Sequence, residues 1–191
     1  TFVKKIMVAN KLNRGMTYIE LIVVLSIFGI MTSAVLFNYG AFQSKVDIKN
    51  LASDIALKIV EAQKSSISGK LPTQATLTSW KPSYGVYLMS NAALDFSDNI
   101  YFNKKFIYFV DLNNANGYEA GSEKISTIAI TKNNYVYRID KCTGVSCPSP
   151  VAVTPLQVIF KRPDSGAIFK DGVGATLPND FEYIQITVKS L

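Results

Sequence analysis

The sequence contains no histidine and only two cysteines among its 191 residues. The lack of histidine removes the side chain that is most often a general base or a metal ligand. A zinc site needs about four ligands, which two cysteines cannot supply. There is also no Gly-x-Ser-x-Gly motif and no glycine-rich phosphate loop. Two carboxylates can still act in glycoside hydrolysis, but no spacing singles out a pair, so we expect a protein that is not an enzyme.

Charge is missing from a long stretch near the N-terminus, because no charged residue lies between Leu21 and Ser44. About 20 apolar residues are enough for a helix to cross a bilayer. Residues 1–15 contain no acid, and their basic residues are Lys4, Lys5, Lys11 and Arg14. Since the flank richer in Lys and Arg stays in the cytoplasm, the sequence predicts a single-pass inner-membrane protein with an extracytoplasmic C-terminal part.

The overall charge gives no sign of nucleic-acid binding. Residues 1–15 hold four of the 20 Lys and Arg and none of the 14 acids, so the net charge of +6 falls to +2 (16 against 14) without them. A balance this close to zero, with dispersed lysines, does not predict a nucleic-acid partner.

One acid, Glu20, lies just inside the apolar stretch. A carboxylate in the bilayer costs on the order of 3 kcal/mol and is by default a hypothesis of function. Either Glu20 stays hydrated near the cytoplasmic interface, or it has a cationic partner. If the chain is cut after Gly15, the new α-amino group of Met16 lies about one helical turn from Glu20. It can then pair with Glu20 in the same chain or in a neighbouring copy.

The segment Gly15-Met16-Thr17-Tyr18-Ile19-Glu20-Leu21 resembles the processing site of bacterial type IV pilins and pseudopilins, and the resemblance covers residues 11–40. It implies that a prepilin peptidase cuts between Gly15 and Met16 and methylates the new N-terminus of Met16. It also implies that Glu20, fifth in the mature chain, guides docking onto a growing filament. The implied partners are other pilin or pseudopilin subunits and an inner-membrane assembly platform.

Some features depart from the family pattern. Met16 stands where many members have Phe, there is no proline between Met16 and Lys70, and the sequence starts at Thr1.

Two other interpretations of this segment compete with the resemblance. A secretory signal with a small-residue site at 32–34 would release a soluble domain, but the helical pattern runs past that site. A plain signal anchor, carrying an extracytoplasmic binding domain or enzyme, would leave Gly15 and Glu20 unexplained.

Beyond Ser44 the apolar residues recur at helical spacing on one side only: Ile48, Leu51, Ala52, Ile55, Ile59 and Ala62. Asp54 and Lys58 are spaced for an i,i+4 ion pair on the other side. Gly69 and Pro72 predict the end of a helix that begins at Met16 and runs to about Ser66. The predicted regions are a leader (1–15), a transmembrane half of the helix (16–44), an amphipathic half (45–69) and a β-sheet domain (70–191).

The remaining chain alternates between segments rich in aromatic and β-branched residues and clusters of turn residues. Lys132-Asn133-Asn134 predicts a hairpin turn, and Thr73–Pro82 an irregular connector. The short connections favour an antiparallel sheet, so the fold class is α+β, with one long helix packed on that sheet as in pilins. The predicted strands are Tyr84–Ser90, Phe106–Leu112, Ser126–Thr131, Tyr135–Asp140, Leu156–Lys161 and Tyr183–Lys189.

Two further segments, Leu156–Phe169 and Tyr84–Tyr87, resemble H-type minor pseudopilins and related minor pilins, which favours a minor subunit. Gly29 and Gly40 interrupt the apolar stretch. They either allow close packing between helices or, at Gly29, mark a place where the helix can unwind in a filament.

The two cysteines, Cys142 and Cys147, lie in Cys-Thr-Gly-Val-Ser-Cys. A disulfide closing this small loop agrees with an oxidising, extracytoplasmic location. The alternative is two free thiols on a surface loop.

An acidic loop follows the second predicted strand. Calcium binds six to eight oxygens from carboxylates, amides and carbonyls around a turn-forming glycine. With one inserted residue, the loop aligns with an EF-type pattern whose ligands would be Asp111, Asn113, Asn116, the Tyr118 carbonyl and Glu123. The insertion and the scarcity of early acids favour a plain polar turn instead, so both interpretations stay open.

Overall fold

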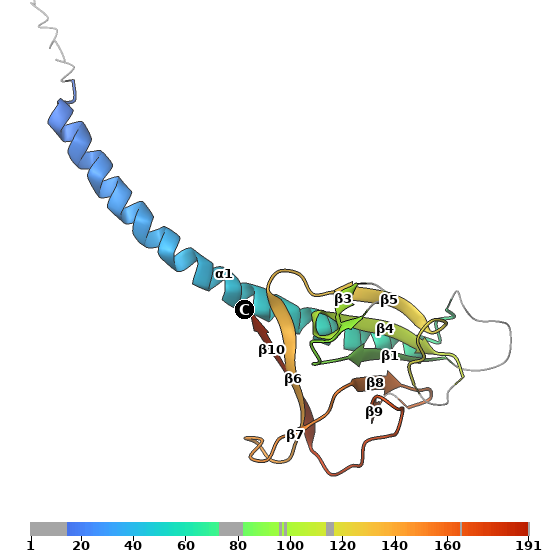
Figure 1. The fold of residues 1–191 in the computed structure, drawn as a ribbon. Coiled ribbons are helices and arrows are strands. Elements are labelled where there is room, and N and C mark those ends of the chain that lie inside the picture. The colour runs from blue at the N-terminus through green and yellow to red at the C-terminus, as the bar shows by residue number, and fades with distance from the viewer. Residues whose placement is uncertain are drawn as a thin grey trace, which may run out of the picture. The chain divides into compact units, whose positions relative to one another are not determined.

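One long helix, α1 (Tyr18–Ser68), dominates the computed structural model (Figure 1). The structure describes residues 15–72, 82–95, 97, 99–113, 117–164 and 166–190. The chain divides into two units, Thr1–Gln43 and Ser44–Leu191, and α1 continues from the first into the second. The predicted helix is confirmed, with each end about two residues later along the chain than expected.

The predicted strands are also confirmed, and the α+β class with them. They are β1 (Ser83–Leu88), β4 (Lys105–Asp111), β5 (Lys124–Ala129), β6 (Asn134–Cys142), β8 (Leu156–Phe160) and β10 (Tyr183–Ser190). Short elements add to them: β2 (Leu94–Asp95), β3 (Ile100–Tyr101), β7 (Val151–Ala152), β9 (Ala167–Lys170) and a 3₁₀ turn η1 (Phe102–Lys104). Of the predicted connector Thr73–Pro82, residues 73–81 lie outside the described residues.

The strands form two main sheets, with strand orders β5-β4-β1-β8-β9 and β10-β6-β7, and a separate β2-β3 ribbon. The pairings within them are antiparallel. The hairpin predicted at Lys132-Asn133-Asn134 is wrong, because β5 pairs with β4 whereas β6 pairs with β10. Lys132 has a positive φ of 62° there, and the chain leaves the first sheet to enter the second. Figure 1 shows β6 and β10 crossing the direction of β1 and β4.

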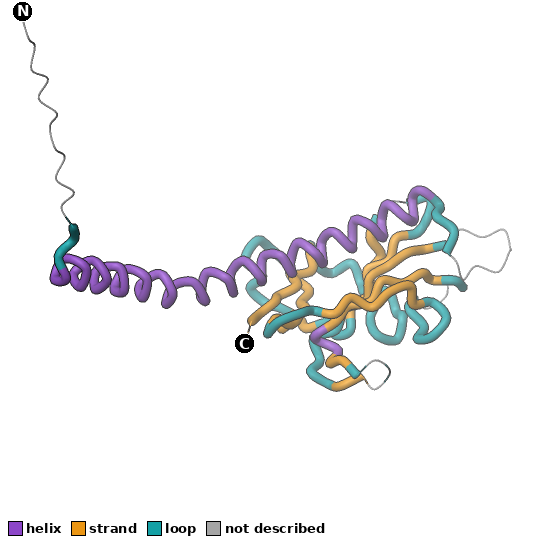
Figure 2. The backbone as a smooth tube through the Cα atoms, turned by 90° about the horizontal axis from the view of Figure 1, so that it is seen from above, coloured by secondary structure: helices purple, strands orange, loops and turns teal. Residues whose placement is uncertain are grey.

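The main core lies between the sheets and the part of α1 that belongs to the second unit. Leu51, Ile55 and Ala62 on α1 pack against buried side chains of β1, β4, β6 and β8. Figure 2 shows this part of α1 lying along the strands. The one-sided apolar pattern beyond Ser44 therefore predicts the packed face of the helix correctly.

The far face of the five-stranded sheet carries a second, smaller cluster built on Ile107, Phe109 and Ile159. Every residue of β4 is buried, because alternate side chains point toward α1 and toward this second cluster. Gly85 in β1 makes room for the ring of Phe109: an added Cβ would lie 2.6 Å from Phe109 Cζ and 2.7 Å from the Val158 carbonyl oxygen. A side chain at position 85 would therefore push the sheet apart.

The C-terminal end of α1 is capped and fastened to the sheet. Gly69 has a φ of 64°, its N–H donates to the Ser66 carbonyl at 3.1 Å, and the Lys70 N–H donates to the Ser65 carbonyl at 3.2 Å. This is the paired bonding of a Schellman cap. The Ser66 hydroxyl donates to the Phe160 carbonyl at 2.7 Å, and the Tyr108 hydroxyl donates to Ser65 Oγ at 3.0 Å.

The ion pair predicted between Asp54 and Lys58 is wrong. Lys58 Nζ instead lies 2.7 Å from Glu61 Oε2 and 5.3 Å from the ring centroid of Tyr108. The ring of Tyr108 therefore gives Lys58 a cation–π contact in addition to its ion pair with Glu61. Asp54 is left facing the turn that follows β5.

Candidate functional site

The predicted cleavage bond lies immediately before α1. Gly15, Met16 and Thr17 are exposed and have no regular structure, and the helix begins at Tyr18. A peptidase needs an accessible backbone that is free of helical hydrogen bonds, and this segment offers one. The structure thus places Gly15 and Met16 where cutting would leave the helix intact.

Thr17 and Glu20 form a capping box at the start of α1. The backbone N–H and the hydroxyl of Thr17 donate to Glu20 Oε2 at 3.3 and 3.2 Å, and the Glu20 N–H donates to Thr17 Oγ1 at 3.4 Å. These reciprocal bonds satisfy donors that a helix start leaves free. The spacing Thr-x-x-Glu is the sequence signal for such a box, and the sequence prediction missed the role of Thr17.

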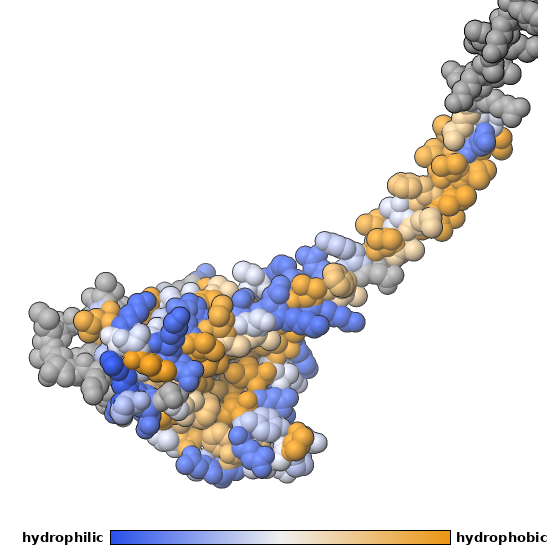
Figure 3. Space-filling model, turned by 180° about the vertical axis from the view of Figure 1, so that it is seen from behind, coloured by the Kyte–Doolittle hydropathy of each residue, from blue (hydrophilic) through white to orange (hydrophobic). Residues whose placement is uncertain are grey.

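Beyond the box, the helix presents apolar side chains to its surroundings. The candidate membrane span is apolar and entirely unburied within the chain. Figure 3 shows apolar side chains over this part of α1. The hydroxyls of Ser26 and Thr32 donate back to the carbonyls of Ile22 and Phe28 at 2.8 Å, so neither needs water. By length and composition, α1 can cross a membrane.

Both glycines of this stretch lie inside continuous α-helix. An added Cβ at Gly29 or Gly40 would meet nothing within 4 Å in this chain. Neither glycine is therefore needed for packing within the chain itself, and both remain candidates for close contact with another helix.

The acidic loop after β4 is organised around Glu123, a fully buried acid. Its Oε1 accepts the Leu112 N–H at 2.8 Å and its Oε2 accepts the Glu119 N–H at 2.7 Å. Burial raises the pKa of the Glu123 carboxyl, the charges of Asp111 and Glu119 raise it further, and the two N–H donors oppose that rise. Glu123 therefore holds both ends of the loop together.

Tyr118 closes the same loop onto the second cluster. Its ring lies 5.1 Å from that of Tyr87 and 5.3 Å from that of Phe109, between centroids. Its N–H donates to Oε1 of the buried Gln157 at 2.8 Å, and Gln157 Nε2 donates to the Asp171 carbonyl at 2.9 Å. Gln157 thus joins the acidic loop to the segment after β9. No pattern in the sequence indicates this role.

The described residues of the acidic loop do not form a calcium cage. Both oxygens of Glu123 face N–H donors, and the Asn113 amide donates to Glu119 Oε1 at 3.0 Å. Among the described residues, no group of three or more acids, cysteines or histidines is placed to hold a metal ion. Asp111 is buried at the end of β4, and Asn116 lies outside the described residues. The calcium site stays a prediction from the sequence.

Cys142 and Cys147 form a disulfide, as predicted. The loop that it closes turns through Gly144, whose φ is 74°, and Cys147, whose φ is 48°. Cys142 is buried at the end of β6, and Val145 at the loop tip is 97% exposed. The bond therefore fixes a small projecting loop to the second sheet.

Comparisons with protein-family models, curated proteins and solved structures found no match for this chain. The residues and their geometry are therefore the basis for any assignment of function.

Proposed function

We propose that this chain is a structural, non-catalytic subunit of a type IV pilus or of a secretion or DNA-uptake pseudopilus, and that it is a minor subunit. The observation that carries the proposal is the order of three features at the N-terminus. An exposed Gly15–Met16 bond is followed by Glu20 in the first helical turn and then by an unburied apolar helix.

In the proposed pathway, the precursor spans the inner membrane with residues 1–15 in the cytoplasm. The prepilin peptidase cuts between Gly15 and Met16 and methylates the new amino group. The assembly platform then moves the subunit out of the membrane into a filament, where the apolar helices of neighbouring subunits pack together. The unit Ser44–Leu191 faces outward from that filament and contacts other subunits or cargo.

Glu20 is proposed to pair with the amino terminus of a neighbouring subunit. Within the described residues, the N–H and the hydroxyl of Thr17 both donate to Oε2 of its carboxylate. A cation near the same carboxylate would lower the cost of burying its charge in an apolar filament core. The pairing would also fix the register between subunits.

A second candidate function is a signal-anchored binding domain or enzyme that never enters a filament. The capping box favours it, because it explains Glu20 without any partner. The two candidates differ in processing, which can be measured directly.

The deciding measurement is the mass of the N-terminal peptide of the protein purified from membranes of its native cell. Trypsin should release Met16–Lys45 carrying one added methyl group if the proposal is correct. A peptide Gly15–Lys45, which trypsin releases from an uncut chain by cutting after Arg14, would show an uncut anchor and contradict the filament role. A new N-terminus after Ala34 would mean a secreted domain, and the assembly role of Glu20 would be wrong.

A further inference from the structure

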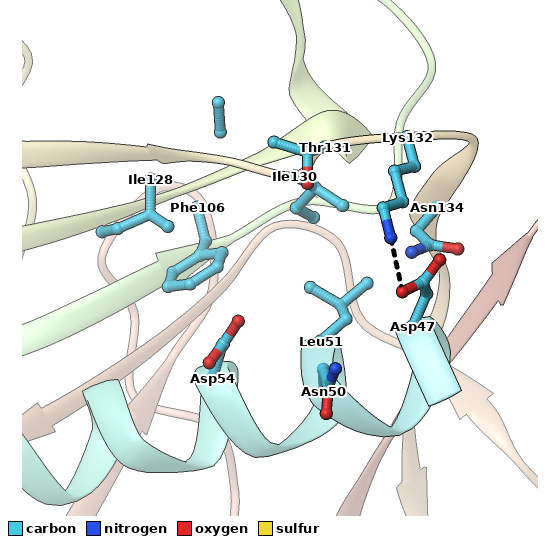
Figure 4. A pocket seen from close by; sticks show the side chains of 11 residues that line it. Asp47, Asn50, Leu51, Asp54, Phe106, Ile128, Ile130, Thr131, Lys132 and Asn134 are labelled. Carbon is cyan, nitrogen blue, oxygen red and sulfur yellow. Dashed lines mark hydrogen bonds and ion pairs between the residues drawn. The ribbon is translucent and has the colours of Figure 1, made fainter. Parts of the chain in front are cut away.

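A pocket of about 200 Å³ lies between α1 and the turn that joins β5 to β6 (Figure 4). Pockets for drug-sized ligands measure about 300–1,000 Å³, so this one has room for roughly one long side chain. Its apolar walls come from Leu51, Phe106, Ile128 and Ile130, and its polar side chains include Asp47, Asn50, Asp54 and Asn134. All of these residues belong to the unit Ser44–Leu191.

The pocket carries one uncompensated negative charge. Asp47 Oδ1 accepts a hydrogen bond from Lys132 Nζ at 2.6 Å, which neutralises that carboxylate (Figure 4). Lys58 turns away from Asp54 toward Glu61. Within the described part of the chain, Asp54 has no ion-pair partner. The lining therefore favours a cation.

Asn134 provides a second, independent indication of a ligand. The residue as a whole is 5% exposed, and it lines the pocket at the start of β6. No described residue makes a hydrogen bond to its side-chain amide. A polar group that enters the pocket could therefore form hydrogen bonds with this amide, which has one carbonyl acceptor and two N–H donors.

We propose that this pocket binds an arginine side chain of a partner protein. A guanidinium group is planar, carries five N–H donors and is weakly hydrated, so it suits a site with apolar walls and several acceptors. Asp54 supplies a carboxylate, and the amides of Asn50 and Asn134 can supply two carbonyl oxygens. Lysine would bring a compact, strongly hydrated charge that matches these acceptors less well. The proposal does not depend on assembly into a filament.

The test uses the ¹⁵N-labelled full chain in detergent micelles and three small probes. These are N-acetyl-arginine methylamide, its lysine counterpart and its citrulline counterpart, which keeps the shape but lacks the charge. The arginine probe should shift the side-chain amide signals of Asn134 and the backbone amide of Asp54. The lysine probe should bind more weakly, and the citrulline probe should leave these signals unchanged.

Substitutions should move the affinity in opposite directions. Asp54→Asn should weaken arginine binding by about fivefold, the scale of one partly exposed charge-assisted hydrogen bond. Lys132→Ala should strengthen it, because Asp47 then loses its internal cation. Asp164→Asn, which removes an exposed acid outside the pocket lining, is the matched control and should change nothing.

Asp54 lies on the exposed surface of a helix, so its substitution by Asn should leave the fold intact. Equal binding of the citrulline and arginine probes would overturn the proposal. So would an arginine affinity that is the same in Asp54→Asn as in the unmodified chain.

Discussion

At the residue scale, Glu20 has two physical explanations that a single substitution separates. In a capping box, a glutamine serves as well as a glutamate, because the side chain acts only through an oxygen acceptor. In the proposed filament, the carboxylate must be charged to pair with the amino terminus of a neighbour. A substitution of Thr17 tests the capping role by itself, because Thr17 contributes a hydroxyl to the box and carries no charge.

Glu20→Gln is therefore expected to keep the helix start and to lose incorporation into filaments. Thr17→Val should keep incorporation while it loosens the first turn of the helix by about 0.5–2 kcal/mol. The measurement is the ratio of subunit in sheared filaments to subunit in membranes, by immunoblot in the native cell. Processing of each variant is checked by the mass of its N-terminal peptide. Normal incorporation of Glu20→Gln would leave capping as the only role of Glu20.

Gly69 is the residue whose backbone conformation most directly determines where α1 ends. Its φ of 64° lies in the left-handed region, which costs other residues roughly 1–2 kcal/mol. An added methyl group would also overlap the guanidinium of Arg162. Gly69→Ala should therefore lower the free energy of unfolding by about 1–3 kcal/mol, measured by urea titration of the full chain in detergent. Gly166→Ala, where an added Cβ meets nothing within 4 Å, should be nearly neutral.

At the scale of elements, one ion pair ties the β2-β3 ribbon to the five-stranded sheet. Lys105 Nζ in β4 lies 2.5 Å from Asp95 Oδ2 in β2, and the Lys105 side chain is only 2% exposed. This hydrogen bond from Lys105, helped by the Ser97 N–H and opposed by burial, lowers the pKa of Asp95 from 3.8 to about 2. The ionised form of Asp95 is more stable, relative to the protonated form, in the folded state than in the unfolded state. The pair therefore stabilises the fold fully above pH 3.8.

That stabilisation is expected to disappear as the pH falls from about 4 to about 2, where Asp95 becomes protonated even in the folded state. After allowance for solvent at the partly exposed carboxylate, the loss should be of the order of 1 kcal/mol. Asp95→Asn should remove this part of the acid dependence in urea titrations over that range. Asp180→Asn, at an exposed pair with Lys141, is the control that should leave it in place.

Local patterns predicted the elements of this fold well because each pattern reports on its own segment. The aromatic and β-branched runs gave β1, β4, β5, β6, β8 and β10, and the one-sided spacing beyond Ser44 gave the buried face of α1. The short strands β2, β3, β7 and β9 were not predicted, because a strand of two to four residues is too short to show an alternating apolar pattern.

Pairing between segments was harder to predict, because a turn does not specify the partner of the strand that follows it. Lys132-Asn133-Asn134 has hairpin chemistry, yet β6 joins β10 from the far end of the chain. Lys58 has a suitably spaced partner in Asp54, but the Tyr108 ring and Glu61 lie on its other side. Likewise Gln157, in the middle of β8, showed no sequence signal for its bonds to the acidic loop. In each case the deciding contact is distant in sequence.

At the scale of the whole molecule, the two units require different surroundings. The unit Ser44–Leu191 has its own buried core, formed between its part of α1 and the sheets. The part of α1 before Ser44 exposes a continuous apolar surface instead. An exposed apolar surface of this kind needs lipid or other proteins around it. In a membrane, the basic residues before the helix are expected to keep the N-terminal end of the chain on the cytoplasmic side.

The expected topology places Lys5 in the cytoplasm and Asp164 outside it. Cysteine reporters introduced singly at these two positions test this in spheroplasts of the native cell, with a maleimide reagent that cannot cross the membrane. Asp164→Cys should be labelled in intact spheroplasts. Lys5→Cys, followed on the uncut precursor because cleavage after Gly15 removes residue 5, should be labelled only after lysis. The native disulfide keeps Cys142 and Cys147 from reacting, and the unsubstituted chain measures that background. The opposite labelling pattern would place the Ser44–Leu191 unit in the cytoplasm, where neither a filament subunit nor an extracytoplasmic anchor is consistent with it.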